Sequence, residues 1–401
     1  MLSDRHPEES VRAEAGRIDG VEALRAIAVA WVVAFHWMVA RDPGRTDPWI
    51  AWVDAHPLAQ AVLRNGYLGV DLFFLITGFL LVIPWVRHAM EGRPAPRARD
   101  FYVRRVLRIV PAYYVHLAAL FVAFAPFLLG TGWMRENGLL LAQNVVAHAS
   151  FLHYTTPITS ASLNLNGALW TLTLEAQFYL LLPLLAPVFV RSPVATAVAM
   201  ALAAGAWRWL ALHGLDPLVA WQMGLAARWN VPESAIRHLL LTQLPGYLGH
   251  FAMGMLLAVV WLRVSRAARS TAATVAHTAA AVAGPAFMSW TFAFGGGAIL
   301  GPVGTWLAIL AGLGGLLLGV AHGGAVVRAV LFHRPILAIG LVSYSIYLWH
   351  VPLLLVLNRL RTFDGAAFAL PAWLAGVGIV AALSWRFVES PFLRKRAPRP
   401  L

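Results

Sequence analysis

The 401-residue sequence contains no cysteine, and only 12% of its residues are charged. The absence of thiols excludes disulfide bonds, a thiolate nucleophile and cysteine-ligated metals. A soluble protein of this length usually carries about twice that share of charged residues. Because 60% of the residues are hydrophobic, the composition instead indicates an all-α protein that crosses a membrane many times.

The charge that is present is unbalanced, since 31 basic and 18 acidic residues give a net charge of +13. We find no nucleic-acid-binding module that would use this surplus, so we predict no nucleic acid as a partner. The arginines lie mostly between apolar runs, as the positive-inside rule predicts for cytoplasmic loops. Lysine is nearly absent while Ala, Arg and Gly are abundant, which is typical of a GC-rich bacterium. We therefore expect a bacterial cytoplasmic membrane protein.

Ten apolar runs reach the length of about 20 residues that is needed to cross a bilayer. They lie at about 20–40, 66–86, 110–130, 170–190, 194–212, 241–262, 273–292, 297–320, 336–357 and 368–389. A shorter run at 139–152 is better interpreted as interfacial or re-entrant. Basic residues are more frequent on the side of the two termini, which predicts that both termini are cytoplasmic.

The predicted domain organisation is simple. We expect a cytoplasmic tail at 1–16, a membrane domain at 17–395 and a second cytoplasmic tail at 396–401. The first 16 residues are polar and do not resemble a cleavable signal peptide, so the first span should direct insertion.

The first run contains the segment RAIAVAWVVAFH, which begins at Arg25 and ends at His36. Eleven residues at ~100° each make three helical turns plus ~20°, so both side chains lie on one face, ~16 Å apart. Charged groups are costly inside a bilayer and usually face a cavity or a partner. A cation and an imidazole at opposite ends of one face suit a long ligand that enters from the cytoplasm.

Three further polar residues fall at a depth similar to that of His36, in the outer half of the membrane. They are Asp71 in the second run, Glu175 in the fourth and His350 in the ninth. Histidine accepts and returns a proton near neutral pH, and a neighbouring carboxylate can fix its tautomer. Asp71 or Glu175 could do this for His36. The four residues lie on four different helices without a metal-ligand spacing, so we predict no metal.

Each polar residue also has a structural interpretation. A single intramembrane histidine more often forms a hydrogen bond between helices than it acts as a catalyst, and Arg25 could extend to the membrane surface. We interpret His116 and His250 as structural, because neither has a matched partner in the sequence.

The segment RDFYVRRVLRIVPAYY contains Arg104, Arg105 and Arg108 just before an apolar run, on one side of a helical turn. Such a cluster is either a positive-inside anchor or a phosphate clamp, because guanidinium groups bind phosphate oxygens well.

Taken together, these segments resemble the acyltransferase-3 family of bacterial membrane acyltransferases over about residues 17–395. The resemblance rests on RIDGVEALRAIAVAWVVAFH, GYLGVDLFFLITGFLL, FYVRRVLRIVP, LWTLTLEAQFYLLLP, SYSIYLWHVP and the closing WRFVESPF. It implies transfer of an acyl group, commonly acetyl, from acyl-CoA to a hydroxyl of a carbohydrate or other acceptor.

The resemblance also implies residue roles. His36 matches the family's catalytic histidine and Arg25 its basic partner, whereas Arg105 and Arg108 match an Arg-x-x-Arg pair associated with the acyl donor. Asp71 and Glu175 match acidic motif positions of the family, and we expect them to assist catalysis. Further candidates for substrate binding are Trp170, Tyr347 and His350.

The sequence departs from the family pattern in three ways. Ala26 replaces a frequent Gly, and Thr77 replaces a usual Ser; both changes are small and touch no proposed chemistry. The sequence also shows no counterpart of the extracytoplasmic esterase-like domain that some members carry, so acceptors that require this domain are not expected.

We therefore expect a membrane O-acyltransferase with acetyl-CoA or another acyl-CoA as the donor. The CoA phosphates would bind Arg25, Arg105 and Arg108, and His36 would act as a general base or as a transient acyl carrier. The acceptor would be a carbohydrate, a glycoconjugate or a similar molecule. Two alternatives stay open: a proton-coupled transporter or flippase, although the internal repeat of many carriers is missing, and acylation of a cytoplasmic small molecule such as a macrolide.

Overall fold

The computed structural model describes residues 19–41, 47–267, 271–293, 296–360 and 365–394. The predicted tails at 1–16 and 396–401 lie outside these ranges. Every secondary-structure element within them is a helix, which confirms the all-α prediction. Eight of the described helices are long and apolar enough to cross a membrane, or nine if one bent pair forms a single span.

The long helices coincide with the predicted runs. They are α2 (Asp19–Ala40), α5 (Leu68–Glu91), α6 (Ala98–Ala119), α11 (Trp170–Arg191), α12 (Pro193–His213), α15 (Leu244–Ala267), α16 (Thr271–Ala293), α17 (Gly296–His322), α20 (Ser343–Arg359) and α21 (Ala369–Ser384). Helix α16, which corresponds to the run at 273–292, is not among the candidate spans, so the described residues support up to nine crossings where the sequence predicted about ten. The third run is longer than predicted, because α6 continues through the π-helical η1 (Leu120–Phe124) into α7 (Ala125–Leu129).

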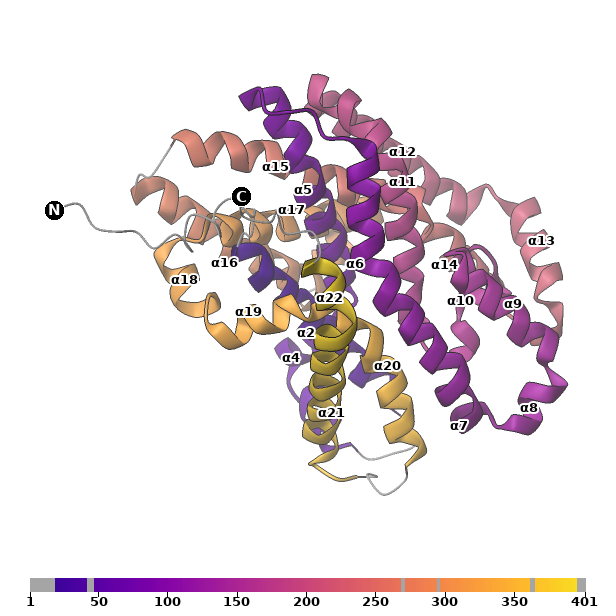
Figure 1. The fold of residues 1–401 in the computed structure, drawn as a ribbon. Coiled ribbons are helices and arrows are strands. Elements are labelled where there is room, and N and C mark those ends of the chain that lie inside the picture. Colours follow the sequence, from indigo (N-terminus) through magenta and orange to yellow (C-terminus); the bar gives the residue numbers. More distant parts are fainter. Residues whose placement is uncertain (1–18, 42–46, 268–270, 294–295, 361–364, 395–401) are drawn as a thin grey trace.

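Four short helices gather on one side of the bundle, at the right in Figure 1. They are α8 (Thr131–Glu136), α9 (Gly138–Ala149), α10 (Pro157–Ser160) and α13 (Asp216–Leu225). The apolar α9 has 12 residues, too few to cross a bilayer. This agrees with the interpretation of the run at 139–152 as interfacial or re-entrant.

Helix α5 is the most buried of the candidate spans and forms the centre of the bundle. It packs against α2, α11 and α15. A Cβ added to Gly78 of α5 would lie 2.3 Å from the carbonyl oxygen of Phe251, and one added to Gly254 of α15 would lie 2.1 Å from that of Leu75. These glycines let the two backbones touch, which is how membrane helices gain close packing.

The ninth predicted run is broken. It forms α19 (Arg334–Leu341) and α20, which are bent by 73° relative to each other. Helix α19 packs against the first turn of α2, where a Cβ on Gly340 would lie only 1.9 Å from the carbonyl oxygen of Glu22. After the bend, α20 packs along α2, and the last helices η7 (Trp385–Glu389) and α22 (Ser390–Arg394) lie against α6 (Figure 1).

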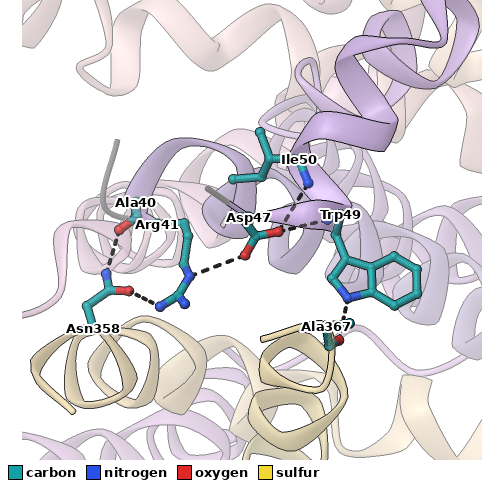
Figure 2. Close-up of polar contacts among 7 residues, drawn as sticks. All are labelled: Ala40, Arg41, Asp47, Trp49, Ile50, Asn358 and Ala367. Atoms are coloured by element: carbon teal, nitrogen blue, oxygen red, sulfur yellow. Dashed lines mark hydrogen bonds and ion pairs between the residues drawn. The ribbon is translucent and has the colours of Figure 1, made fainter. Parts of the chain in front are cut away.

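A buried polar cluster joins the ends of α2 and α20 (Figure 2). Arg41 donates to Asp47 Oδ2 over 3.3 Å and to Asn358 Oδ1 over 2.9 Å, and Asn358 donates to the carbonyl oxygen of Ala40 over 2.7 Å. Asp47 also caps α3 (Pro48–Asp54), since its Oδ1 accepts from the first backbone amides. The exposed fractions of Arg41 and Asp47 are only 3% and 5%. The cluster therefore fixes the last turns of α2 and α20 side by side.

Candidate active site

A pair of histidines joins α2 to α20. His350 Nε2 lies 3.1 Å from His36 Nδ1, and the two ring centroids are 4.7 Å apart at an interplanar angle of 74°. His350 is fully buried, whereas His36 is half-buried. The sequence predicts that these residues lie at similar depth, and the structure places them in contact.

The hydrogen bonds of the pair define its tautomers. His350 Nδ1 lies 2.7 Å from the carbonyl oxygen of Tyr347 and 3.1 Å from that of Ile346. A carbonyl oxygen only accepts, so this nitrogen carries the proton and Nε2 of neutral His350 accepts. His36 Nδ1 then donates, both to His350 and to the carbonyl oxygen of Val32 at 2.9 Å. His36 Nε2 is left with its lone pair, which is the form a general base requires.

The two predicted carboxylates have partners other than His36. Asp71 Oδ1 lies 3.5 Å from Nε2 of His250 on α15, and Glu175 accepts a hydrogen bond from Tyr179, one turn later on α11. Depth along a span can be read from the sequence, but the direction in which a side chain points around the helix depends on the packing. His350 therefore takes the place beside His36 that we expected a carboxylate to occupy.

His250 and His116, which we interpreted as structural residues without a matched partner in the sequence, both have polar partners in the structure. His250 faces Asp71 across the glycine-lined contact of α5 and α15. His116 Nε2 lies 3.1 Å from Nδ2 of Asn166, whose amide also donates to the carbonyl oxygen of Leu348 on α20. Both histidines join helices that are distant in sequence, so their partners could not be found by local spacing.

A cavity of about 150 Å³ lies between α2, α5, α6, α11 and α20. The three arginines predicted to bind the acyl donor, which are Arg25, Arg105 and Arg108, all line it. Glu175 and Thr77 line it as well. Four separate sequence motifs thus contribute to one cavity, although the role of each residue in binding or catalysis stays a prediction.

Acidic and aromatic side chains hold the arginines of the cavity. Arg25 Nη1 lies 3.4 Å from Glu22 Oε2, and Arg108 Nη1 lies 3.9 Å from Glu389 Oε2. The Arg105 guanidinium lies 5.8 Å from the centre of the Tyr179 ring, within the range of a cation–π contact. Sequence reasoning missed Glu389, which is 1% exposed. Its place in WRFVESPF, a segment noted only for its resemblance, was the signal available.

The cavity retains hydrogen-bond donors that its own side chains do not satisfy. Among the described residues, Arg105 Nε, Arg108 Nη2 and Ser343 Oγ are buried and have no hydrogen-bond partner. All three residues line the cavity. Buried donors in native proteins are nearly always paired, and guanidinium groups pair best with phosphate or carboxylate oxygens. This set of donors therefore fits an anionic ligand.

The two aromatic candidates for substrate binding lie in different places. Tyr347 lines the cavity, and its ring centroid is 5.7 Å from that of His350. Trp170 instead belongs to an aromatic cluster, with ring centroids 5.2 Å from Tyr154 and 5.6 Å from Tyr247. The structure therefore places Tyr347 beside both the cavity and the histidine pair.

A second pair of histidines lies outside the predicted spans. His148 on α9 and His153 stack with ring centroids 4.1 Å apart, and both are fully buried. His148 Nε2 lies 2.7 Å from Ser162 Oγ. Burial lowers the pKa of His148 to about 4 and that of His153 to about 3, so both rings are neutral at neutral pH. Reasoning from the sequence did not single out these residues.

Comparison with known proteins identifies the family. A family model described as an acyltransferase domain matches residues 18–388. Nodulation protein 10 of Rhizobium leguminosarum bv. viciae is 30% identical, over 95% of this chain and 95% of that protein. The peptidoglycan O-acetyltransferase OatA of Listeria monocytogenes is 24% identical, over 93% of this chain and 55% of that protein.

The O-acetyltransferase OatA of Staphylococcus aureus is 23% identical, over 94% of this chain and 57% of that protein. The chain thus spans about half the length of these two O-acetyltransferases and nearly the whole length of the nodulation protein. No solved structure matches it. The match over residues 18–388 and the many apolar helices show that this multi-pass membrane protein belongs to the acyltransferase-3 family.

Proposed function

We propose that this protein is an O-acyltransferase that moves an acyl group, acetyl in the simplest case, from cytoplasmic acyl-CoA to a hydroxyl of a carbohydrate or glycoconjugate. The observation that carries the proposal is the cavity with three arginines beside the His36–His350 pair. Two relatives that are named as O-acetyltransferases support the acetyl group, and one of them is named for peptidoglycan. Membership in an acyltransferase family favours this enzyme over a transporter.

The arginines favour acyl-CoA as the acyl donor. Arg105 and Arg108 offer buried donors without partners, and the phosphates of CoA supply the anionic oxygens that such donors bind. Arg25 lies on the same face of α2 as His36, ~16 Å away. An extended arm that is anchored by phosphate at the arginines would therefore carry its thioester towards His36.

The tautomer of His36 leaves Nε2 free to accept a proton, which allows direct acyl transfer with His36 as the general base. Nε2 takes the proton from the acceptor hydroxyl while the hydroxyl oxygen attacks the thioester carbon. The carbon–sulfur bond then breaks, and the proton moves from Nε2 to the leaving sulfur, which gives the ester and CoA. His350 Nε2 accepts the bond from His36 Nδ1 throughout and holds the ring. General-base catalysis of this kind contributes about 10²–10⁴-fold to the rate.

The same lone pair also suits a two-step path. His36 Nε2 could attack the thioester itself, release CoA and carry the acyl group until the hydroxyl displaces it. Ping-pong kinetics and a labelled His36 peptide after rapid quenching would establish this path, whereas direct transfer requires both substrates to be bound together.

The test is acyl transfer from radiolabelled acetyl-CoA in purified membranes, with peptidoglycan fragments and a panel of oligosaccharides as acceptors. His36→Ala should lower transfer by about 10²–10⁴-fold, and Arg105→Ala should mainly raise KM for acetyl-CoA. The matched controls are His333→Ala and Arg99→Ala, which alter exposed residues. Transfer by His36→Ala at the rate of the His333→Ala control would refute the proposal.

A further inference from the structure

The cavity and the histidine pair lie next to each other but are not joined. Among the described residues that line the cavity, neither His36 nor His350 is present. Tyr347 lines it and lies one turn before His350 on α20, with the two ring centroids 5.7 Å apart. Tyr347 is therefore a lining side chain of the cavity that also contacts the histidine pair, and we take the path of an acyl group from the cavity to His36 to run past it.

Hydrogen bonds and ring contacts hold Tyr347 across this passage. Its hydroxyl donates to the carbonyl oxygen of Ala168 over 2.6 Å and lies 2.7 Å from Thr171 Oγ1. Ala168 lies in the 3-10 helix η4 (Gly167–Leu169) just before α11, and Thr171 lies in the first turn of α11, so the side chain connects α20 to the start of this span. Its ring makes an edge contact with Phe73 of α5 at 6.2 Å. The side chain thus touches two helices that line the cavity, and it is 6% exposed.

We propose that Tyr347 separates the acyl donor from the histidine pair and so decides between transfer and hydrolysis. The inference rests on the proposed function. While Tyr347 bridges to α11, water that reaches the half-buried His36 is kept from the thioester. Displacement of Tyr347 lets the acyl group and an acceptor hydroxyl meet at His36. If water met the thioester, the same carbon–sulfur bond would break and give a free carboxylic acid and CoA.

Because the sequence contains no cysteine, the separation of the cavity from the histidine pair by Tyr347 can be measured with a single introduced thiol and without any enzyme turnover. Ser343 lines the cavity, and its hydroxyl has no hydrogen-bond partner among the described residues, so Ser343→Cys places one thiol there with little change of volume. A small membrane-impermeant methanethiosulfonate reagent is then added to one side of sealed vesicles at a time. The rate of modification from the His36 side reports how often the passage is open.

Removing the hydrogen bonds of the Tyr347 hydroxyl should raise the rate of thiol modification from the His36 side by a predictable factor. Tyr347→Phe keeps the ring and loses two hydrogen bonds, each of which corresponds to roughly fivefold in an equilibrium, so we expect roughly 5- to 30-fold faster modification from the His36 side. Tyr347→Ala should give a larger increase. The rate from the Arg105 side should stay the same in Tyr347→Phe, which keeps the ring in the cavity wall, and this also shows that the variant is folded.

The matched control is Tyr344→Ala. Tyr344 also lines the cavity from α20, but its hydroxyl donates to the carbonyl oxygen of Ile109 on α6 and not to α11. This variant enlarges the cavity and should leave the rate from the His36 side unchanged. Equal rates of thiol modification from the His36 side in the protein with Tyr347, in Tyr347→Phe and in Tyr347→Ala would overturn the proposal that Tyr347 separates the cavity from the histidine pair.

A second measurement tests whether the separation by Tyr347 limits hydrolysis of the acyl donor. The ratio of free acetate to acetylated acceptor should rise in Tyr347→Ala, and an unchanged ratio would count against the role in transfer. The two proposals can fail separately. Restricted thiol modification without any acetyl transfer would refute the proposed function alone, whereas acetyl transfer with equal modification rates would refute only the separation by Tyr347.

Discussion

Replacing His350 with leucine tests the geometry of the histidine pair most directly. In the structure, His36 Nδ1 has two acceptors, which are His350 Nε2 at 3.1 Å and the carbonyl oxygen of Val32 at 2.9 Å. Leucine removes the first and leaves the second. When His36 Nε2 takes a proton during the reaction, the His36 ring is positively charged. The bond to His350 that leucine removes is then a hydrogen bond from a charged donor.

The size of the effect follows from that bond. A hydrogen bond to a charged group contributes about 1.5–3 kcal/mol, so His350→Leu should lower kcat by about 10- to 150-fold. This is less than the loss expected for His36→Ala, because the base itself remains. KM for acetyl-CoA should change little, since the arginines that we assign to the donor lie at the other end of the face that carries His36.

The assay is steady-state transfer from labelled acetyl-CoA by purified protein, with kcat and KM measured separately. His350→Gln should recover part of the lost rate, because its side-chain oxygen can accept from His36 Nδ1. A merely structural His350 would not distinguish glutamine from leucine in this way. A leucine variant with kcat within twofold of wild type would refute the role that we assign to His350.

Three further predictions concern stability, measured by thermal or urea unfolding in detergent. Asp47→Ala should cost about 1–3 kcal/mol, because it removes one hydrogen-bond partner of the buried Arg41 guanidinium, which keeps its bond to Asn358, and also uncaps α3. Stability should be fully retained above about pH 6.5 and fall as the pH falls towards about 4. The pKa values of His148 and His153 are lowered by burial, so the unfolded chain binds more protons in that window. Gly78→Ala should destabilise strongly, because the new Cβ would lie 2.3 Å from a backbone carbonyl oxygen that cannot move alone.

Each of these variants has a control at a site without the feature. Asp54→Ala removes an exposed ion pair and should change stability by at most about 1 kcal/mol. His148→Gln combined with His153→Gln should flatten the loss of stability between about pH 6.5 and 4, and an unchanged slope would exclude these histidines as its cause. Gly376→Ala lies in α21 with open space around the new Cβ and should be neutral or stabilising.

Much of the fold could be predicted from the sequence, because the length and apolarity of a run decide whether it can cross a bilayer. The runs coincide with long helices, and the short run at 139–152 coincides with α9. The break between α19 and α20 could not be predicted in this way. It is accompanied by the close contact of Gly340 with Glu22 on α2, a residue more than 300 positions away, and such a tertiary contact is not visible in the apolar pattern of one run.

The candidate site shows the same division. The spacing of Arg25 and His36 places them on one face of α2, and the resemblance selected Arg105 and Arg108, which line the same cavity as Arg25. The partner of His36 was predicted as a carboxylate, and the structure places His350 there. Periodicity gives the depth of a residue within a span, but only tertiary packing decides which helix its side chain faces.

A neutral partner for His36 is consistent with the proposed chemistry. In a medium of low dielectric constant, a carboxylate beside a protonated imidazole forms a strong ion pair and would hold the proton there. His350 is neutral in the tautomer that its backbone contacts define, so it orients His36 without adding a buried charge. The proton that His36 takes from the acceptor is then more readily returned to the leaving sulfur. On this reasoning, a carboxylate introduced by His350→Asp should slow turnover below the rate of His350→Gln, even though aspartate is also an acceptor.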